Sequence, residues 1–248
     1  MSETSDDRAG SSRRSLYWFL RGIATAFSVP GLILSSAFIG FGGLAKESGI
    51  SLLQAVFMVG TVWALPANVV LIGNIVAGAS LPAAAFAVAL SSVRLMPMVV
   101  ALVPEMRTAK TRSWVLYLLS HCVAVTSWVL AMERFKRVPQ DMRTVFYGGL
   151  GWTLVVVNMG VVAVVYAVAD ELPPAVAAAL FLITPIYFLL SLWGSARERA
   201  SHVAMVVGIA LGPLLHLVVP GFDLLIAGLV GGGIAYLFHR KQQARATA

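Results

Sequence analysis

Residues 80–104 read SLPAAAFAVALSSVRLMPMVVALVP, an apolar run with a single arginine near its centre. A helix of about 20 predominantly apolar residues is long enough to cross the hydrocarbon core of a bilayer. The whole chain shares this character, with 59% hydrophobic and only 12% charged residues, whereas soluble domains have roughly 25% charged residues. The stretch therefore predicts a membrane-spanning helix, and the composition predicts an integral membrane protein.

Short polar segments separate this run from others of similar length. We predict an all-α bundle of seven or eight transmembrane helices, several of them broken by proline or glycine, embedded in the lipid bilayer as one domain over residues 16–240. Residues 1–15 are expected to form a disordered cytoplasmic tail, and residues 241–248 a second one. The apolar runs cover residues 16–45, 51–77, 80–104, 113–132, 145–169, 174–193, 202–219 and 222–238.

The net charge is +7, and the basic residues gather in the tails and short loops. This distribution is typical of orientation signals and predicts a cytoplasmic N-terminus, with no nucleic-acid partner. The loop EMRTAKTR at 105–112 conflicts with eight crossings, because it would place Arg107, Lys110 and Arg112 outside. Either the rule is broken locally, or one of the first three segments is re-entrant and the chain crosses seven times.

An internal repeat is a further expectation, since many transporters are built from two related halves. The segment LMPMVVALVP at 95–104 aligns without gaps on LGPLLHLVVP at 211–220. The predicted halves are 16–132 and 145–238. In this alignment Arg94 faces Ala210, so the charge belongs to one half only.

Several apolar runs contain helix breakers. Proline frees backbone groups in a helix, and inside a membrane these groups must be buried in protein or line a wet cavity. Such breaks build substrate sites in transporters, although proline and glycine can also simply kink or pack membrane helices. The candidates are Pro30, Pro97, Pro185 and Pro213, together with Gly42 and Gly43 of the GFGG segment.

The segment WALPAN at 63–68 combines an aromatic residue, a breaker and an amide in Trp63, Pro66 and Asn68. An unwound backbone near Pro66, with the donor and acceptor of the Asn68 amide, could hold the amino or carboxyl group of a zwitterion. The alternative role for Asn68 is an interhelical hydrogen bond.

Arg94 lies too deep in its run for the side chain to reach the interface easily. A central arginine is costly in a membrane and usually marks a pathway, an ion pair or a ligand site. Apart from Asp223 at the very start of the last run, no Asp or Glu lies inside any apolar run, which favours a carboxylate ligand held through two hydrogen bonds. The alternative is a structural arginine that caps carbonyl groups freed by Pro97. The neighbouring Ser91, Ser92 and Met96 are candidate site residues.

An enzymatic role is not expected. Neither Ser91 nor Ser92 sits in a nucleophile-elbow motif, and the chain has no HExxH and no P-loop. The single cysteine, Cys122, excludes an internal disulfide and a Cys-rich metal site, so neither a cofactor nor a metal is predicted. His121 and His216 are the two residues within the apolar runs that could couple transport to protons, although a histidine in such a place is more often a hydrogen-bonded core residue.

Four segments carry a family resemblance: RG at 21–22, GFGGLAKESGISLLQAVFM at 40–58, WALPAN, and GASLPAAAFAVALSSVRLMPMVVALVP at 78–104. Together they resemble the AzlC-type branched-chain amino acid permeases. The resemblance implies an exporter of these amino acids in a bacterial inner membrane, working with a small AzlD-type membrane subunit. It also places Asn68 where relatives often have glutamine, whereas the residues before Arg94 and the segment IGFGG depart from the family pattern, which suggests a divergent branch.

The leading hypothesis is a permease that exports branched-chain or related small amino acids by alternating access. Arg94 would hold the carboxylate, Asn68 and the backbone near Pro66 the amino group, and Trp63 and Met96 the apolar side chain. One alternative is a carrier or channel for another small solute on the same scaffold. Another is a membrane assembly subunit without transport activity, in which Arg94 is structural.

Overall fold

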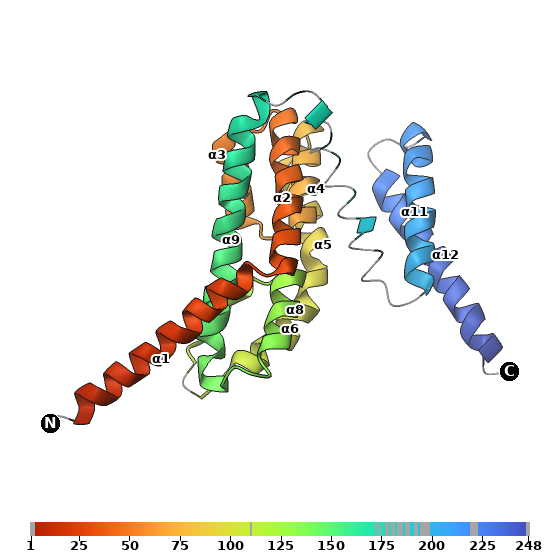
Figure 1. The fold of residues 1–248 in the computed structure, drawn as a ribbon. Helices are drawn as coiled ribbons and strands as arrows, with labels where there is room; N and C mark the ends of the chain where they lie inside the picture. Colours follow the sequence, from red (N-terminus) through yellow and green to blue (C-terminus); the bar gives the residue numbers. More distant parts are fainter. Residues whose placement is uncertain are drawn as a thin grey trace. The chain divides into compact units, whose positions relative to one another are not determined.

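A computed structural model describes residues 3–109, 111–171, 199–218 and 223–246, with a few single positions between 173 and 193. Over these residues every regular element is a helix (Figure 1), as predicted. The chain divides into two compact units, Met1–Pro185 and Ile186–Ala248, where one domain over residues 16–240 was expected. The predicted count of seven or eight transmembrane helices is not confirmed, because the described residues contain three helices long and apolar enough to cross a membrane.

Helix α9 (Arg143–Val168) is the axis of the first unit. It packs against α1 (Glu3–Ala26), α2 (Val29–Glu47) and α3 (Leu52–Thr61), and Figure 1 shows it running the length of the unit. At the crossing of α1 and α9, a Cβ on Gly22 would meet the carbonyl oxygen of Phe146, and a Cβ on Gly149 would meet that of Phe19. Glycine at both positions allows the two backbones to approach closely, as small residues do in membrane helix pairs.

The first apolar run contains a break between α1 and α2. Pro30 lies in the first turn of α2, where its missing N–H has no intrahelical partner to lose. Helix α1 begins at Glu3, so residues 3–15 are helical where a disordered tail was expected.

The second run does not form the expected span. It contains two half-helices, α3 with 10 residues and α4 (Leu65–Val76) with 12. At 1.5 Å per residue these are about 15 and 18 Å long, well short of the roughly 30 Å hydrocarbon core. Figure 1 shows α3 beside the upper half of α9 and α4 on the other side of α2.

The direction of each half-helix follows from its contacts. Just before α3, the carbonyl of Ile50 accepts a hydrogen bond from the Tyr166 hydroxyl near the end of α9, at 2.8 Å. The helix then reaches Met159, which lies against Gly60. Helix α4 returns to the starting level, because Ile75 shares a surface pocket with Ile50. Helices α3 and α4 are therefore a re-entrant hairpin, the first hairpin.

The run at 113–132 is broken in the same way, into α7 (Ser113–His121) and α8 (Val125–Arg134). After α7, Cys122 lies against Gly151 in the middle of α9. Helix α8 then returns, because the carbonyl of Phe135 just after it accepts a 3.0 Å hydrogen bond from Arg143 at the start of α9. This second hairpin enters from the opposite end of the unit.

The apolar run at residues 80–104 forms one continuous span, Leu81–Met106. Helices α5 (Leu81–Ser92) and α6 (Met96–Met106) are joined by one turn of 3-10 helix, η1 (Val93–Leu95). The other two span candidates are Val29–Glu47 and Gln140–Val168. Apolar side chains such as Leu81 and Phe86 are 83% and 69% exposed, as expected for a surface that faces lipid.

Basic residues gather at one end of this unit, here called the basic end. Arg143 forms a 2.6 Å ion pair with Glu105 at the end of α6, and Arg14 of α1 pairs with Asp141 at 3.3 Å. The loop after α6 lies here too, since Gln140 donates a 3.3 Å hydrogen bond to the carbonyl of Arg107. The re-entrant first hairpin thus places the conflicting loop at the same end as the other basic loops.

The repeat visible in the structure differs from the predicted halves 16–132 and 145–238. A hairpin followed by a span occurs twice, over residues 52–106 and 113–168, and the two copies run in opposite directions. The second unit contains α11 (Arg199–Val218) and α12 (Asp223–Ala246), which pack against each other. Helix α12 continues into residues 241–246, where a tail was expected.

Candidate functional site

The tips of both hairpins meet the 3-10 turn of the central span. A pocket of about 280 Å³ is lined by residues 61–64 of the first tip, residues 120, 121 and 123 of the second, and residues of α5, η1 and α6. Its volume lies just below the usual range of roughly 300–1,000 Å³ for small-molecule sites. Three interruptions of regular helix therefore share one small cavity.

The first tip is held by the amide of Asn68. This side chain is fully buried, and its Nδ2 donates a 2.9 Å hydrogen bond to the carbonyl of Val62. The Oδ1 atom has no hydrogen-bond partner among the described residues. Pro66 lies in the first turn of α4, which explains why the chain begins a new helix here instead of extending α3.

Trp63 forms an apolar wall at the first tip. Its side chain is 5% exposed and stacks on Phe38 of α2, with ring centroids 5.5 Å apart. The indole Nε1 has no acceptor among the described residues. The ring therefore fixes the tip against α2 while it lines the pocket.

The second tip is held by Ser127. Its Oγ accepts a 2.9 Å hydrogen bond from the Ala124 backbone N–H and donates one of 2.7 Å to the carbonyl of Cys122. The hydroxyl of Tyr147 on α9 lies 3.3 Å away. A side chain three residues into a helix thus satisfies the backbone of the turn before it, as a capping residue does.

His121 connects the two tips. Its Nε2 lies 2.9 Å from the carbonyl oxygen of Gly60 and donates to it, and its ring stacks on Trp152 of α9 at 5.8 Å between centroids. Because His121 ends α7 and Gly60 lies at the end of α3, this is a direct hydrogen bond between half-helices that enter from opposite ends.

The ends of all four half-helices lie at the pocket. Thr61 and His121 are the last residues of α3 and α7, Ala64 directly precedes the first residue of α4, and Val123 lies two residues before the first residue of α8. Helix N-termini carry partial positive charge and C-termini partial negative charge. The pocket therefore offers complementary charge to both an anionic and a cationic group of one ligand.

The remaining walls combine apolar surface with acceptor oxygens. Val88, Leu95 and Val99 of the central span line one side. The hydroxyl of Ser92 donates a 2.8 Å hydrogen bond to Val88 of its own helix, so its oxygen keeps lone pairs to accept another. Thr61 and Ser120 make similar bonds within their own helices.

Some of the predicted site residues come together in this pocket. Trp63, Ser92 and His121 line it, and Pro66 and Asn68 lie in the helix directly behind the first tip. The central turn η1 carries Arg94, but this residue is exposed in its unit and does not line the pocket.

Other predicted residues lie elsewhere. Ser91 is half-buried and Met96 is 63% exposed, and neither lines the pocket. Gly42 is buried against Val165 of α9, a packing position. Its neighbour Gly43 is half-buried on the same helix and is not a lining residue either.

The predicted breakers have different positions in their helices. Pro97 lies in the first turn of α6, and Pro213 lies inside α11. His216 is also in α11, but its side chain and the whole of Pro185 lie outside the described residues.

The second tip was missed by sequence reasoning. Residues 122–124 read CVA and contain no proline or glycine. The available signal was the pair Thr126 and Ser127, which are residue types that begin helices.

A helical membrane unit whose broken helices surround a small cavity belongs to the class of membrane transport proteins. A family model described as AzlC protein matches residues 31–172, more than half of the 248 residues. The chain belongs to the AzlC family of transport-related membrane proteins. The matched segment contains both hairpins and runs through the end of α9. Comparison with curated proteins and with solved structures gives no match.

Proposed function

We propose that this chain exports branched-chain or related small amino acids across the bacterial inner membrane by alternating access. The observation that carries the proposal is the pocket between the two hairpin tips, where the ends of four half-helices face one small cavity. A zwitterion needs both an anionic and a cationic subsite within a few ångströms, and opposed helix ends provide both.

In this binding mode, the substrate carboxylate lies at the N-termini of α4 and α8. The ammonium group lies at the carbonyl groups that end α3 and α7, with the acceptor oxygen of Ser92 nearby. An aliphatic side chain packs against Leu95 and Val99. The volume of about 280 Å³ favours one small amino acid over a larger solute.

The opposed hairpins support the proposal of alternating access. Each hairpin closes the pocket from its own end of the unit, so movement of one tip opens the pocket to one side only. The bond between His121 and Gly60 joins the tips in the state described here. We assign proton coupling to His121, with His216 as the second candidate.

The positive-inside rule assigns the basic end and the N-terminus to the cytoplasm. Three spans of the first unit and the apolar runs at 174–193, 202–219 and 222–238 then give six crossings and two re-entrant hairpins. The basic segments GSARERAS and HRKQQAR also lie inside in this arrangement.

Filling the pocket tests the site. We expect Leu95→Trp to abolish uptake of radiolabelled leucine into inverted vesicles, because the indole would occupy the cavity. The matched control is Leu90→Trp on the same span, where the side chain is 55% exposed and does not line the pocket. Equal transport by both variants would contradict the site, and absence of flux for valine, leucine and isoleucine in the wild type would contradict the substrate.

The sequence suggested Arg94 as the group that binds the substrate carboxylate, and this assignment can be tested separately. Because Arg94 does not line the pocket, we expect Arg94→Ala to leave the KM for leucine within about threefold, a change under 1 kcal/mol. If Arg94→Ala raises the KM much more than this, and Arg94→Lys raises it less, then Arg94 binds the substrate carboxylate.

We also propose that the chain works with a small AzlD-type membrane subunit, as the family resemblance implies. Co-expression with the product of a neighbouring gene, followed by purification through a tag on this chain, tests the pair. The proposal fails if transport in proteoliposomes is complete with this chain alone.

A further inference from the structure

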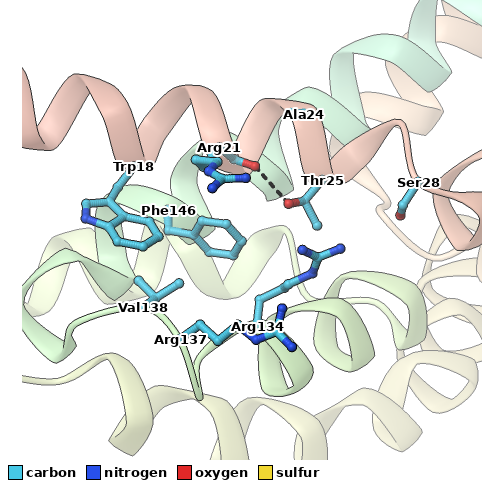
Figure 2. Close-up of a pocket in the computed structure, with 9 residues that line it drawn as sticks. All are labelled: Trp18, Arg21, Ala24, Thr25, Ser28, Arg134, Arg137, Val138 and Phe146. Carbon is cyan, nitrogen blue, oxygen red and sulfur yellow. Dashed lines mark hydrogen bonds between the residues drawn. The ribbon is translucent and has the colours of Figure 1, made fainter.

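A second pocket lies at the basic end, away from the hairpin tips. It encloses about 310 Å³ between α1, α8 and α9, and it shares no lining residue with the pocket at the tips. Figure 2 shows Arg21 reaching into it from α1, with Arg134 and Arg137 on the opposite side. Among the described residues, no carboxylate lines it.

The arginines of this pocket differ from their neighbours. Arg143 and Arg14, also at the basic end, each pair with an acidic residue. By contrast, Arg21 donates to the Tyr17 hydroxyl at 3.0 Å, a neutral partner. Two guanidinium groups at this end therefore have carboxylates, whereas the three at the pocket have no ion pair within the described part of the chain.

Two buried polar atoms at the pocket also lack partners. The Nε of Arg134 and the Oγ of Ser28 are inaccessible to solvent and have no hydrogen-bond partner among the described residues. The hydroxyl of Thr25 already donates a 2.8 Å hydrogen bond to the carbonyl of Arg21, drawn in Figure 2. A buried donor without an acceptor is costly, more so when it is charged.

Repulsion among three cations adds to this cost, because like charges in a partly buried site disfavour each other. One bound anion would remove both costs, because it accepts a hydrogen bond from the buried donor and offsets the repulsion among the three cations. Guanidinium groups bind phosphate oxygens through paired hydrogen bonds, and several can surround one tetrahedral group. Trp18 lines the same pocket, and tryptophan is enriched at the level of lipid headgroups.

We propose that this pocket binds a phosphate-bearing anion. Its volume accommodates a phosphate group but not a whole lipid, so the source is either free phosphate or the headgroup of an anionic phospholipid at the membrane surface. Because Arg134 ends α8, the bound anion holds the second hairpin to α1. Trp18, Arg21 and Ser28 precede the segment matched by the family model, so part of the site lies outside it. The site does not depend on which solute is transported.

The test is a titration of each probe into the detergent-solubilised full chain, with the heat of binding measured by calorimetry. Inorganic phosphate is the first probe and short-chain phosphatidylglycerol the second, with sodium acetate and short-chain phosphatidylcholine as comparisons. The variants are Arg134→Gln and Arg137→Gln. The matched control is Lys136→Gln, which removes the same charge from an exposed position between them that does not line the pocket.

We expect affinity to fall about tenfold in each arginine variant and to stay unchanged in Lys136→Gln, since one charge-assisted hydrogen bond is lost. If only phosphate binds, the ligand is a free anion, and if only phosphatidylglycerol binds, it is a lipid headgroup. If both bind, the site recognises the phosphate group from either source. The proposal is overturned if neither probe binds, if acetate binds as tightly as phosphate, or if Lys136→Gln loses as much. Should Arg134→Gln fail to fold, the exposed Arg137 carries the test.

Discussion

The two re-entrant hairpins use different side chains to satisfy the backbone groups of the turn at their tips. In each, a buried polar residue of the returning half-helix donates to the carbonyl three residues before the first residue of that helix: Asn68 to Val62, and Ser127 to Cys122. Ser127 also accepts from the backbone of its own turn. The Oδ1 of Asn68 has no partner among the described residues. The first tip therefore has an acceptor atom without a donor, whereas the Oγ of Ser127 in the second tip accepts a hydrogen bond.

The tips also differ in how they contact α9. The Cβ of Cys122 lies so close to Gly151 that a Cβ added there would be 2.6 Å away, whereas a Cβ on Gly60 would meet the flexible end of Met159 at 3.1 Å. The second tip thus packs against α9 through the Cβ of Cys122, which moves only with its backbone, whereas the first packs against the flexible end of a methionine side chain. The first tip is therefore expected to move more easily than the second.

The largest expected effect is all-or-none: it concerns the side of the membrane from which a cysteine at each loop can be labelled. In a Cys122→Ala background, single cysteines at Glu47 and Ala79 should react with an impermeant maleimide from one side of the membrane. Cysteines at Ser113 and Lys136 should react only from the other side. If residues 47 and 79 label from opposite sides, the first hairpin is a full span.

Next is the contact of the second tip with α9. Gly151→Ala should lower the free energy of unfolding in detergent by about 1–3 kcal/mol, because the added methyl collides with Cys122. Gly60→Ala should cost less than about 1 kcal/mol, because the Met159 side chain can shift. Adding Cys122→Gly should recover part of the Gly151→Ala loss, and equal losses for the two glycines would remove the distinction between the tips.

A smaller effect separates the two polar side chains. Ser127→Ala should lower the free energy of unfolding by about 1–2 kcal/mol, because two backbone groups lose their partner. Asn68→Ala should cost about 1 kcal/mol but raise the KM for leucine, which Ser127→Ala should leave nearly unchanged. Thermal unfolding and vesicle transport measure the two quantities, and the reverse pattern would assign the ligand role to the second tip.

The smallest effect concerns the bond between the tips. His121→Phe keeps a ring against Trp152 but removes the hydrogen bond to Gly60. We expect a stability loss of about 1 kcal/mol or less and faster reaction of a cysteine placed at Thr61 with a permeant maleimide, since the first tip opens more often. An unchanged labelling rate would show that this bond does not hold the first tip closed.

Hydropathy was sufficient to predict a helical membrane protein, and Pro66 marked the first break because proline ends a helix through local sterics. The conflict at residues 105–112 indicated a re-entrant segment, although not which one. The second break was not predictable from breakers, because it depends on Ser127 and on contact with Gly151, a long-range interaction. Arg94 was correctly placed near the middle of its span, but a helix turns about 100° per residue, so the charge at 94 and the pocket-lining Leu95 face different directions.

The half-length of the hairpins has a consequence for synthesis. Residues 52–76 and 113–134 precede α9 in the chain, and their tips expose backbone N–H and C=O groups that hydrocarbon cannot satisfy. Neither hairpin can settle at its final depth until residues 143–168 arrive to receive it. The depth of both hairpins therefore depends on α9, the last helix of the first unit to be synthesised among those that contact them.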